Sequence, residues 1–193
     1  MEILGKILGS PARVKIMRLF LLNRDKGFNI KDVIKRSRTD PDMVRRELKL
    51  LSSINFVKKH GTVWFFNYLF KYTSELEGLL VSADTFDKQT IISGFKKVGK
   101  VKLIVISGIF LKEKNSRVDL LIVGDKMQKG KIQEEIRKIE AEIGSELVYA
   151  VFDTKEFIYR LNMYDKLVWD IFDFPHEIVL QSKELSTQAF KKA

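Results

Sequence analysis

One short stretch of the chain, residues 40–51, carries polar side chains at a spacing that could read a nucleic acid. Four of them recur at i, i+3, i+4 and i+7 and so share one helix face. They are Asp42, Arg45, Arg46 and Lys49. An arginine fork matches the two acceptors on the edge of guanine, and lysine suits a phosphate. The face is interpreted as a DNA-reading surface; the alternative is a charged face that is only solvated. Asp42 could accept a hydrogen bond from a cytosine amine or complement the helix N-terminus, and the second role is favoured.

The residues around this face give the signals of a short helix. Asp40 can accept hydrogen bonds from the backbone N–H groups of the first turn, and Pro41 suits the first helical position, where no N–H is needed. Val44, Leu48 and Leu51 fall opposite the basic residues. We therefore expect one side of the helix to face a core and the other to face solvent or a ligand.

Two further helices are predicted before this one. Ser10-Pro11 marks the start of the first, PARVKIMRLFLLN, and Asn29 can cap the second, IKDVIKRS. Residues 1–8 also carry an apolar stripe at helical spacing, which is expected to pack on this module or on a second subunit. The order of helix, short helix, tight turn and basic helix is that of a helix-turn-helix.

After the basic helix the apolar period changes from 3.6 to 2. FVKKHGTVWFFNYL gives two short strands around Gly61, which can take the positive φ of a hairpin turn. The tip carries Lys58, Lys59 and His60, which are placed to touch phosphates. The aromatic run at 64–66 could be a base-stacking platform, but packing of that strand against the helices is the favoured interpretation.

These residues together resemble a known DNA-binding family. Residues 10–66 are similar to the winged helix-turn-helix of transcription regulators, chiefly through SRTDPDMVRRELKLLSSINFVKK. In that family the third helix enters the major groove, so the resemblance implies double-stranded DNA as a partner, and a homodimer is expected because paired half-sites multiply affinity. The implied DNA-contacting residues are Arg38, Thr39, Asp42, Arg45, Arg46, Lys49, Lys58, Lys59 and His60.

The second half of the chain alternates between strand and helix patterns. VKLIVIS, RVDLLIVG and ELVYAVF have the length and composition of strands, KIQEEIRKIEAEI is a helix with an isoleucine stripe, and HEIVLQS adds an extended segment. The stretch DTKEFIYRLNMYDKLVWDIFD is predicted to be helical. Its expected aromatic anchors are Phe157, Tyr164, Trp169 and Phe172.

Within this half, SGIFLKEKNSRVDLLIVGD combines a Gly/Ser turn with a later strand that bears an acidic residue. This resembles the minimal nucleotidyltransferase domain of the polymerase-β type, and ELVYAVFDTKEF is similar to that family's third strand and the helix after it. The family implies two Mg²⁺ ions, held by carboxylates two residues apart on one strand and usually by a third from a neighbouring strand.

The residues at the positions of that motif do not complete the carboxylate set. The turn reads Ser107-Gly108, the paired positions are Arg117 and Asp119, and Val148 and Ala150 stand where a third carboxylate would be expected. Asp125, expected beyond its strand, and Asp153 could be proposed as substitutes, but solvated loop carboxylates are the favoured interpretation. We therefore expect an inactive relative with no catalytic residue, no metal and no cofactor.

The charge of the chain is concentrated in its first third. Residues 1–66 contain 15 Lys and Arg against six Asp and Glu, whereas residues 67–193 contain 20 against 19. A basic module beside a neutral one suggests that the first binds a polyanion. The absence of cysteine, of a long apolar run and of a signal peptide favours a cytoplasmic protein that has no membrane partner.

The sequence thus predicts a mixed α+β or α/β chain. The expected parts are a winged helix-turn-helix at 1–70, a helical connector at 71–99 that ends at Gly99, a small nucleotidyltransferase-like domain at 100–182 with a short mixed sheet flanked by helices, and a tail at 183–193. The leading hypothesis is a DNA-binding transcriptional regulator whose second domain supplies dimerisation or effector sensing. The alternatives are an Mg²⁺-dependent nucleotidyltransferase acting on a protein or small molecule, and a protein-interaction adaptor.

Overall fold

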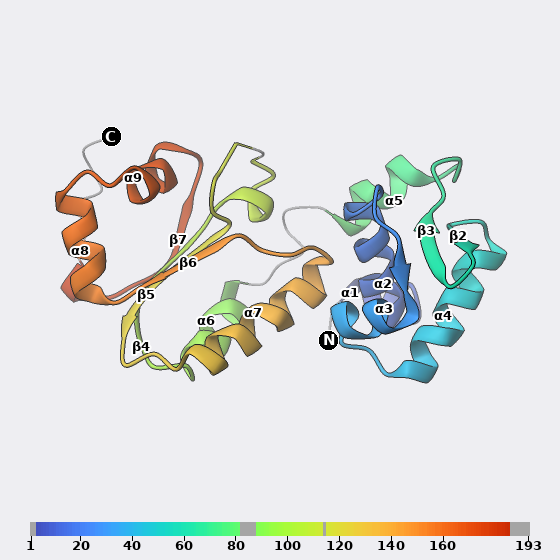
Figure 1. The fold of residues 1–193 in the computed structure, drawn as a ribbon, viewed down its shortest axis with the longest axis horizontal. Helices are drawn as coiled ribbons and strands as arrows, with labels where there is room; N and C mark the ends of the chain where they lie inside the picture. Colours follow the sequence, from blue (N-terminus) through green and yellow to red (C-terminus); the bar gives the residue numbers. More distant parts are fainter. Residues whose placement is uncertain (1–2, 82–87, 114, 186–193) are drawn as a thin grey trace. The chain divides into compact units, whose positions relative to one another are not determined.

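The chain has a mixed α+β fold that divides into two compact units (Figure 1). The computed structural model describes residues 3–81, 88–113 and 115–185. Of these, residues 3–81 and 137–146 form the first unit, and the remaining residues form the second. The mixed class expected from the sequence is confirmed.

Residues 3–81 of the first unit form five helices. They are α1 (Ile3–Ile7), α2 (Pro11–Leu22), α3 (Ile30–Ser37), α4 (Pro41–Ser53) and α5 (Thr73–Leu80). The predicted caps of the middle three are confirmed. Ser10 accepts a hydrogen bond from the N–H of Arg13, Asn29 forms a capping box with Asp32, and Asp40 caps α4. These local hydrogen bonds fix where each helix begins.

A small antiparallel sheet lies beside these helices. Its strands are β1 (Phe28–Asn29), β2 (Val57–His60) and β3 (Val63–Phe66), in the order β1-β3-β2. The predicted hairpin of β2 and β3 is confirmed, and Gly61 in its turn has φ of +59°. The sequence did not reveal β1, because a strand of two residues is too short to show a period of two.

The core of the first unit collects the apolar side chains of all these helices. Val44, Leu48 and Leu51 of α4 are buried there as expected, with Phe20 of α2 and Phe56 among the largest members. Trp64 is half-buried and packs against the same cluster, as the favoured packing interpretation required. On α1, Leu4 packs on this core while Ile3 and Ile7 are exposed.

The second unit contains a four-stranded mixed sheet and the helices that flank it. The strands are β4 (Lys100–Ile106), β5 (Leu120–Asp125), β6 (Tyr149–Phe152) and β7 (Glu177–Gln181), in the order β6-β5-β4-β7. The β5/β6 pair is parallel, and β4 is antiparallel to both of its neighbours. The other elements are α6 (Lys88–Phe95), α8 (Thr154–Asn162), α9 (Lys166–Asp173), the 3₁₀ turns Gly108–Phe110 and Lys183–Leu185, and the first part of α7 (Lys129–Ile143). Residues 137–143 of α7 belong to the first unit.

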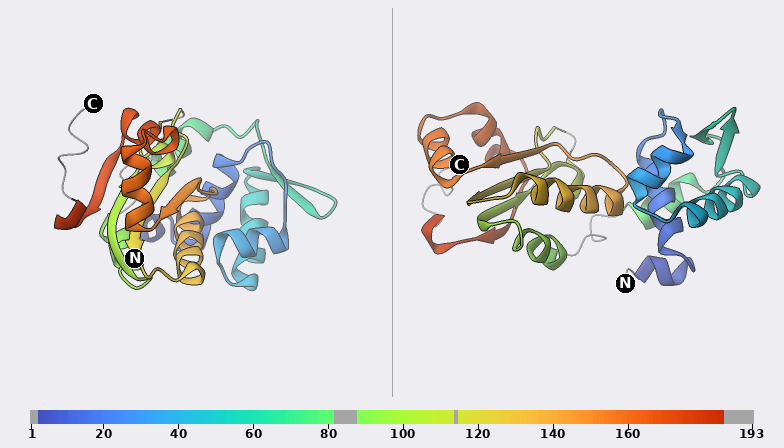
Figure 2. Two further views of the ribbon diagram at one scale, coloured as in Figure 1. Left: turned by 60° about the vertical axis from the view of Figure 1, so that its left-hand side comes forward. Right: turned by 60° about the horizontal axis from the view of Figure 1, so that its bottom comes forward.

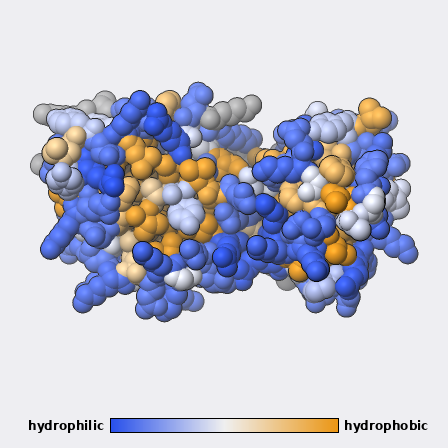
Figure 3. Space-filling view, in the orientation of Figure 1, coloured by the Kyte–Doolittle hydropathy of each residue, from blue (hydrophilic) through white to orange (hydrophobic). Residues whose placement is uncertain are grey.

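Helices cover both faces of this sheet (Figure 2). Side chains of α8 and α9 pack with Leu103, Leu121 and Val123 in one cluster. Because alternate strand residues point to opposite faces, Ile104 and Ile122 face the side of α6 and α7. Figure 3 shows hydrophobic residues gathered in the middle of the drawn face of this unit, with hydrophilic residues around them.

Two details of the second half differ from the sequence expectation. The helix predicted to end at Gly99 ends at Phe95, and residues 96–99 form a turn. The expected anchor Tyr164 is 77% exposed and stacks on Trp169 outside the core, because it lies in the turn between α8 and α9. Of the predicted connector and tail, residues 82–87 and 186–193 lie outside the described residues.

The first unit also includes a segment that is distant in sequence, residues 137–146. Two buried polar side chains hold it, Arg18 of α2 and Asn23, the residue that follows α2. Arg18 donates to the carbonyl of Glu142 at 2.9 Å, and Asn23 donates to the carbonyl of Gly144 at 2.8 Å. Among the described residues, no helix is both long and apolar enough to cross a membrane.

Candidate nucleic-acid interface

The outer face of α4 presents its basic side chains to solvent. The side chains of Arg45 and Arg46 are 60% and 69% exposed, that of Asp42 is 90% exposed, and Lys49 is also exposed. The inner face is anchored by fully buried leucine and valine side chains. The structure therefore places these four predicted residues together on one accessible surface.

Local hydrogen bonds at the start of α4 fix this surface. The Asp40 carboxylate accepts from the N–H of Asp42 at 2.9 Å and from the N–H of Met43 at 3.3 Å. Asp42 in turn pairs with Arg45 at 2.5 Å across one helical turn. An acidic residue in the first turn is stabilised by the partial positive charge of the helix N-terminus, which is the role favoured for Asp42.

The turn before α4 supplies the next two predicted residues. Arg38 is exposed and adopts a left-handed backbone conformation, with φ of 50°, at the end of α3. Thr39 is half-buried, and its hydroxyl donates to the carbonyl of Ser37 at 3.2 Å. The Thr39 side chain thus stabilises the turn, while Arg38 lies on the surface at the edge of the α4 face.

The hairpin carries the remaining predicted contacts. Lys58, Lys59 and His60 are all exposed on β2, and the Lys59 ammonium lies 5.5 Å from the centre of the Trp64 ring. The hairpin is joined directly to the end of α4, where the N–H of Phe56 donates to the carbonyl of Leu51 at 2.9 Å. The basic hairpin and the basic helix face are therefore parts of one unit.

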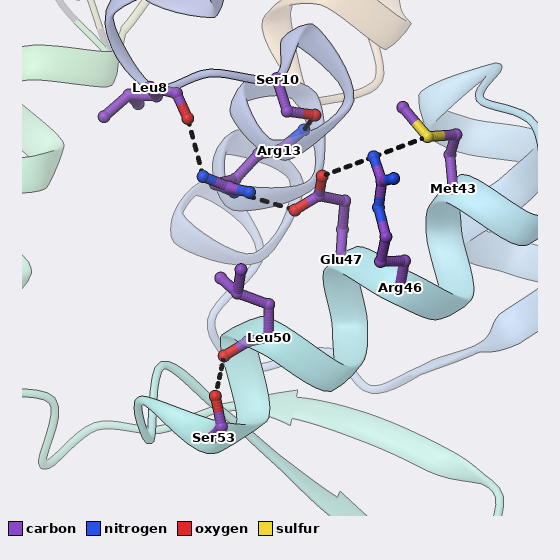
Figure 4. Close-up of polar contacts among 8 residues, drawn as sticks. All are labelled: Leu8, Ser10, Arg13, Met43, Arg46, Glu47, Leu50 and Ser53. Carbon is purple, nitrogen blue, oxygen red and sulfur yellow. Dashed lines mark hydrogen bonds and ion pairs between the residues drawn. The ribbon is translucent and has the colours of Figure 1, made fainter.

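Sequence reasoning missed one charged residue of this helix, Glu47. Its side chain is only 1% exposed, and its Oε2 atom accepts from Nε of Arg13 on α2 at 2.8 Å (Figure 4). Arg13 also donates from Nη1 to the carbonyl of Leu8 at 2.7 Å. This part-buried ion pair joins α4 to α2. The sequence does indicate this burial: Glu47 has the helical spacing of Val44 and Leu51 and therefore falls on the inner face of α4.

Both oxygens of the Asp119 carboxylate in the second unit accept hydrogen bonds from backbone donors. Its Oδ1 accepts from the N–H of Ile109 and its Oδ2 from the N–H of Val148, both at 2.8 Å. Gly108 has φ of +52°, and a Cβ there would overlap the Asp119 carboxylate. Asp119 therefore joins the turn after β4 to the residue before β6, and this explains why the turn needs glycine.

The other residues of the predicted nucleotidyltransferase motif also have structural partners. Arg117 pairs with Asp170 of α9 at 2.7 Å. Ser107 is buried, and its hydroxyl lies 2.7 Å from the Ser116 hydroxyl and donates to the carbonyl of Pro175 at 3.0 Å. The structure thus brings Ser107 and Gly108 together with Asp119, while Arg117 is directed to α9.

Asp125 and Asp153 stand at the other end of the sheet. Asp125 is the last residue of β5, not a residue beyond the strand, and it pairs with Lys102 at 2.9 Å. Hydrogen bonds from Lys102 and Thr154 lower the pKa of Asp125 to about 2. Asp153 caps α8 by accepting from the N–H of Glu156 at 2.7 Å. The prediction that Asp125 is a solvated loop carboxylate was therefore wrong, because strand pairing brings Lys102 beside it. Among the described residues, no group of three His, Cys, Asp or Glu side chains could hold a metal ion.

No protein-family model, no curated protein and no solved structure matches this chain.

Proposed function

We propose that the first unit is a winged helix-turn-helix that binds double-stranded DNA, and that the chain is a transcriptional regulator. The observation that carries this proposal is the outer face of α4, where Arg45, Arg46 and Lys49 are exposed on a helix whose opposite face is fully buried. Such a helix can enter the major groove without unfolding any of its core. The basic hairpin beside it can contact the flanking phosphates.

Charge supports the same proposal. Lys and Arg exceed Asp and Glu by nine in residues 1–66, and by one in the rest of the chain. A protein that neutralises phosphates releases counterions, so its affinity falls steeply as salt is added. A protein-interaction adaptor built on the same fold would lack this dependence on salt when offered duplex DNA.

We propose further that the second unit keeps a nucleotidyltransferase-like fold as a non-catalytic module for dimerisation or effector sensing in a homodimer. The support is the use of Asp119, whose two oxygens each accept a backbone hydrogen bond, and of Arg117, which occupies the companion position and pairs with Asp170. An active relative would transfer a labelled nucleotidyl group from one of the four nucleoside triphosphates with Mg²⁺, and such transfer would refute this part of the proposal.

The test of DNA binding is fluorescence anisotropy of labelled duplexes, first from a random-pool selection, across a series of salt concentrations. The wild-type protein should bind with a linear fall of log affinity against log salt. Arg45→Ala/Arg46→Ala should lose affinity, by about 1–3 kcal/mol for the arginine that reads a base. Lys59→Ala should weaken all sequences alike.

The matched control removes two exposed lysines from the second unit, Lys155 and Lys166. Lys155→Ala/Lys166→Ala has the same net charge as the double arginine variant, yet should keep wild-type affinity because the charges lie on α8 and α9. Equal losses in the two double variants would show that only the net charge matters. Unchanged DNA affinity in a folded Arg45→Ala/Arg46→Ala protein would show that the α4 face was assigned wrongly.

A further inference from the structure

Two arginines stand side by side on the α4 face, and the structure gives them different surroundings. Arg45 pairs with Asp42, whose side chain is 90% exposed, so both partners remain hydrated. An exposed pair of this kind holds its members weakly. Arg45 is therefore free to exchange Asp42 for a phosphate or water.

Arg46 lies against a buried acidic group. Its Nη2 atom is 3.9 Å from Oε1 of Glu47, and the same nitrogen donates to the sulfur of Met43 at 3.0 Å (Figure 4). The guanidinium is thereby held over the turn of α4 that precedes it, between a sulfur and a carboxylate. A methionine sulfur is a weak acceptor, and at 3.9 Å the carboxylate attracts the guanidinium by its charge without a hydrogen bond.

The carboxylate of Glu47 is itself fixed. Oε2 is held by Arg13, which is anchored in turn on the carbonyl of Leu8. Oε1 is buried and accepts no hydrogen bond. A buried oxygen without a donor is costly, and the cation beside it is Arg46. Glu47 can therefore accept one N–H from Arg46 without moving its own side chain far.

We propose that Glu47 is a positioning residue and that it makes Arg46, rather than Arg45, the arginine that reads a guanine. A guanidinium has five N–H donors, so one can turn to Glu47 Oε1 while a fork of two meets the O6 and N7 acceptors of guanine in the major groove. A contact with Glu47 would restrict the orientation of the Arg46 fork, so the fork would lose less freedom on binding. This inference rests on the proposed DNA-binding function and assigns its base specificity.

The experiment measures discrimination at single bases by the purified full chain. Random-pool selection with the wild-type protein gives the preferred duplex, and affinity is then measured for that duplex and for duplexes in which each guanine is replaced in turn. Arg46→Ala and Glu47→Gln should both lose discrimination at the same guanine, by about 5- to 150-fold. Arg45→Ala, the matched control, should weaken all duplexes alike and reduce the salt slope by about one.

The double variant separates positioning from simple support of the fold. In a protein that already carries Arg46→Ala, Glu47→Gln should cause no further loss of discrimination, because its effect acts through Arg46. A structural role alone would weaken every duplex equally and would persist in the Arg46→Ala background. The inference would be overturned by an equal loss for every duplex, by a further loss in the Arg46→Ala background, or by a Glu47→Gln protein that discriminates between bases as well as the wild type does.

Variants that leave the buried pair intact keep the test valid should Glu47→Gln fail to fold. Arg46→Lys retains the charge but removes the fork, so it should lose discrimination at that guanine with an unchanged salt slope. Arg45→Lys should retain discrimination, and the opposite outcome would overturn the inference. A wild-type protein that shows no salt-dependent binding to duplex DNA would instead overturn the proposed function, on which the inference depends.

Discussion

The ion pair of Arg13 with the buried carboxylate of Glu47 gives a prediction about the stability of the first unit. Arg13→Met removes the donor to a carboxylate that is only 1% exposed. Removing one partner of a fully buried pair costs about 3–5 kcal/mol, because the other charge is left uncompensated. The Arg13 side chain is 27% exposed and Arg46 lies 3.9 Å from the other oxygen, so solvent and Arg46 should recover part of this cost. We expect a loss of about 2–3 kcal/mol in the free energy of unfolding.

The assay is urea unfolding followed by tryptophan fluorescence. The chain has two tryptophans, Trp64 in the first unit and Trp169 in the second. In a Trp169→Phe background, the fluorescence therefore reports on the unit that contains the pair. Arg13→Met should lower the midpoint without changing the slope, since the surface exposed on unfolding stays the same.

A second variant tests the physical reason. Arg13→Met/Glu47→Leu replaces both charges by apolar groups, so no buried carboxylate is left unpaired, and most of the lost stability should return. Arg45→Met, which breaks the exposed pair with Asp42, should cost less than about 1 kcal/mol. A loss below about 1 kcal/mol for Arg13→Met, or a double variant as unstable as the single one, would refute the reasoning.

Three further predictions concern single positions elsewhere in the chain. Asp119→Asn should destabilise the second unit by about 1–2 kcal/mol, because an amide can accept only one of the two backbone hydrogen bonds. Urea unfolding monitored by tryptophan fluorescence measures this loss. The same variant should keep its DNA affinity, and a loss of DNA affinity would contradict a purely structural role for Asp119. Gly27→Ala should destabilise the hairpin by about 1–3 kcal/mol in thermal unfolding, because a Cβ there would lie 2.5 Å from the Phe65 ring. Wild-type stability in this variant would show that β3 does not pack tightly against Gly27. The Asp125 carboxyl, whose pKa is lowered from 3.8 to about 2, should titrate near that lower value by ¹³C NMR. Its stabilising contribution is complete above the unfolded value and is lost as the pH falls through the folded one, and Lys102→Met should move the pKa back up; an unchanged pKa in that variant would remove Lys102 as the cause.

The starts of the helices and the sides they bury could be predicted from the sequence. Ser10, Asn29 and Asp40 cap helices as expected, and the apolar residues of α4 face the core. These features depend on hydrogen bonds to residues two or three positions away and on a spacing of three or four residues. Because these interactions join residues that are close in sequence, the order of residues alone predicts them.

The roles of the charged side chains depended on contacts between distant parts of the chain. Arg13 and Glu47 are 34 positions apart. Asp119, singled out from the sequence as the remnant of a metal site, instead joins two backbone segments. Tyr164 was expected in the core and lies outside it. Helical spacing shows which residues share a face, but only the packing of elements decides what that face meets. The basic face of α4 could thus be predicted from the order of residues alone. Which of its arginines lies beside a buried carboxylate could not, because Glu47 is buried where α4 packs on α2 and is held there by Arg13.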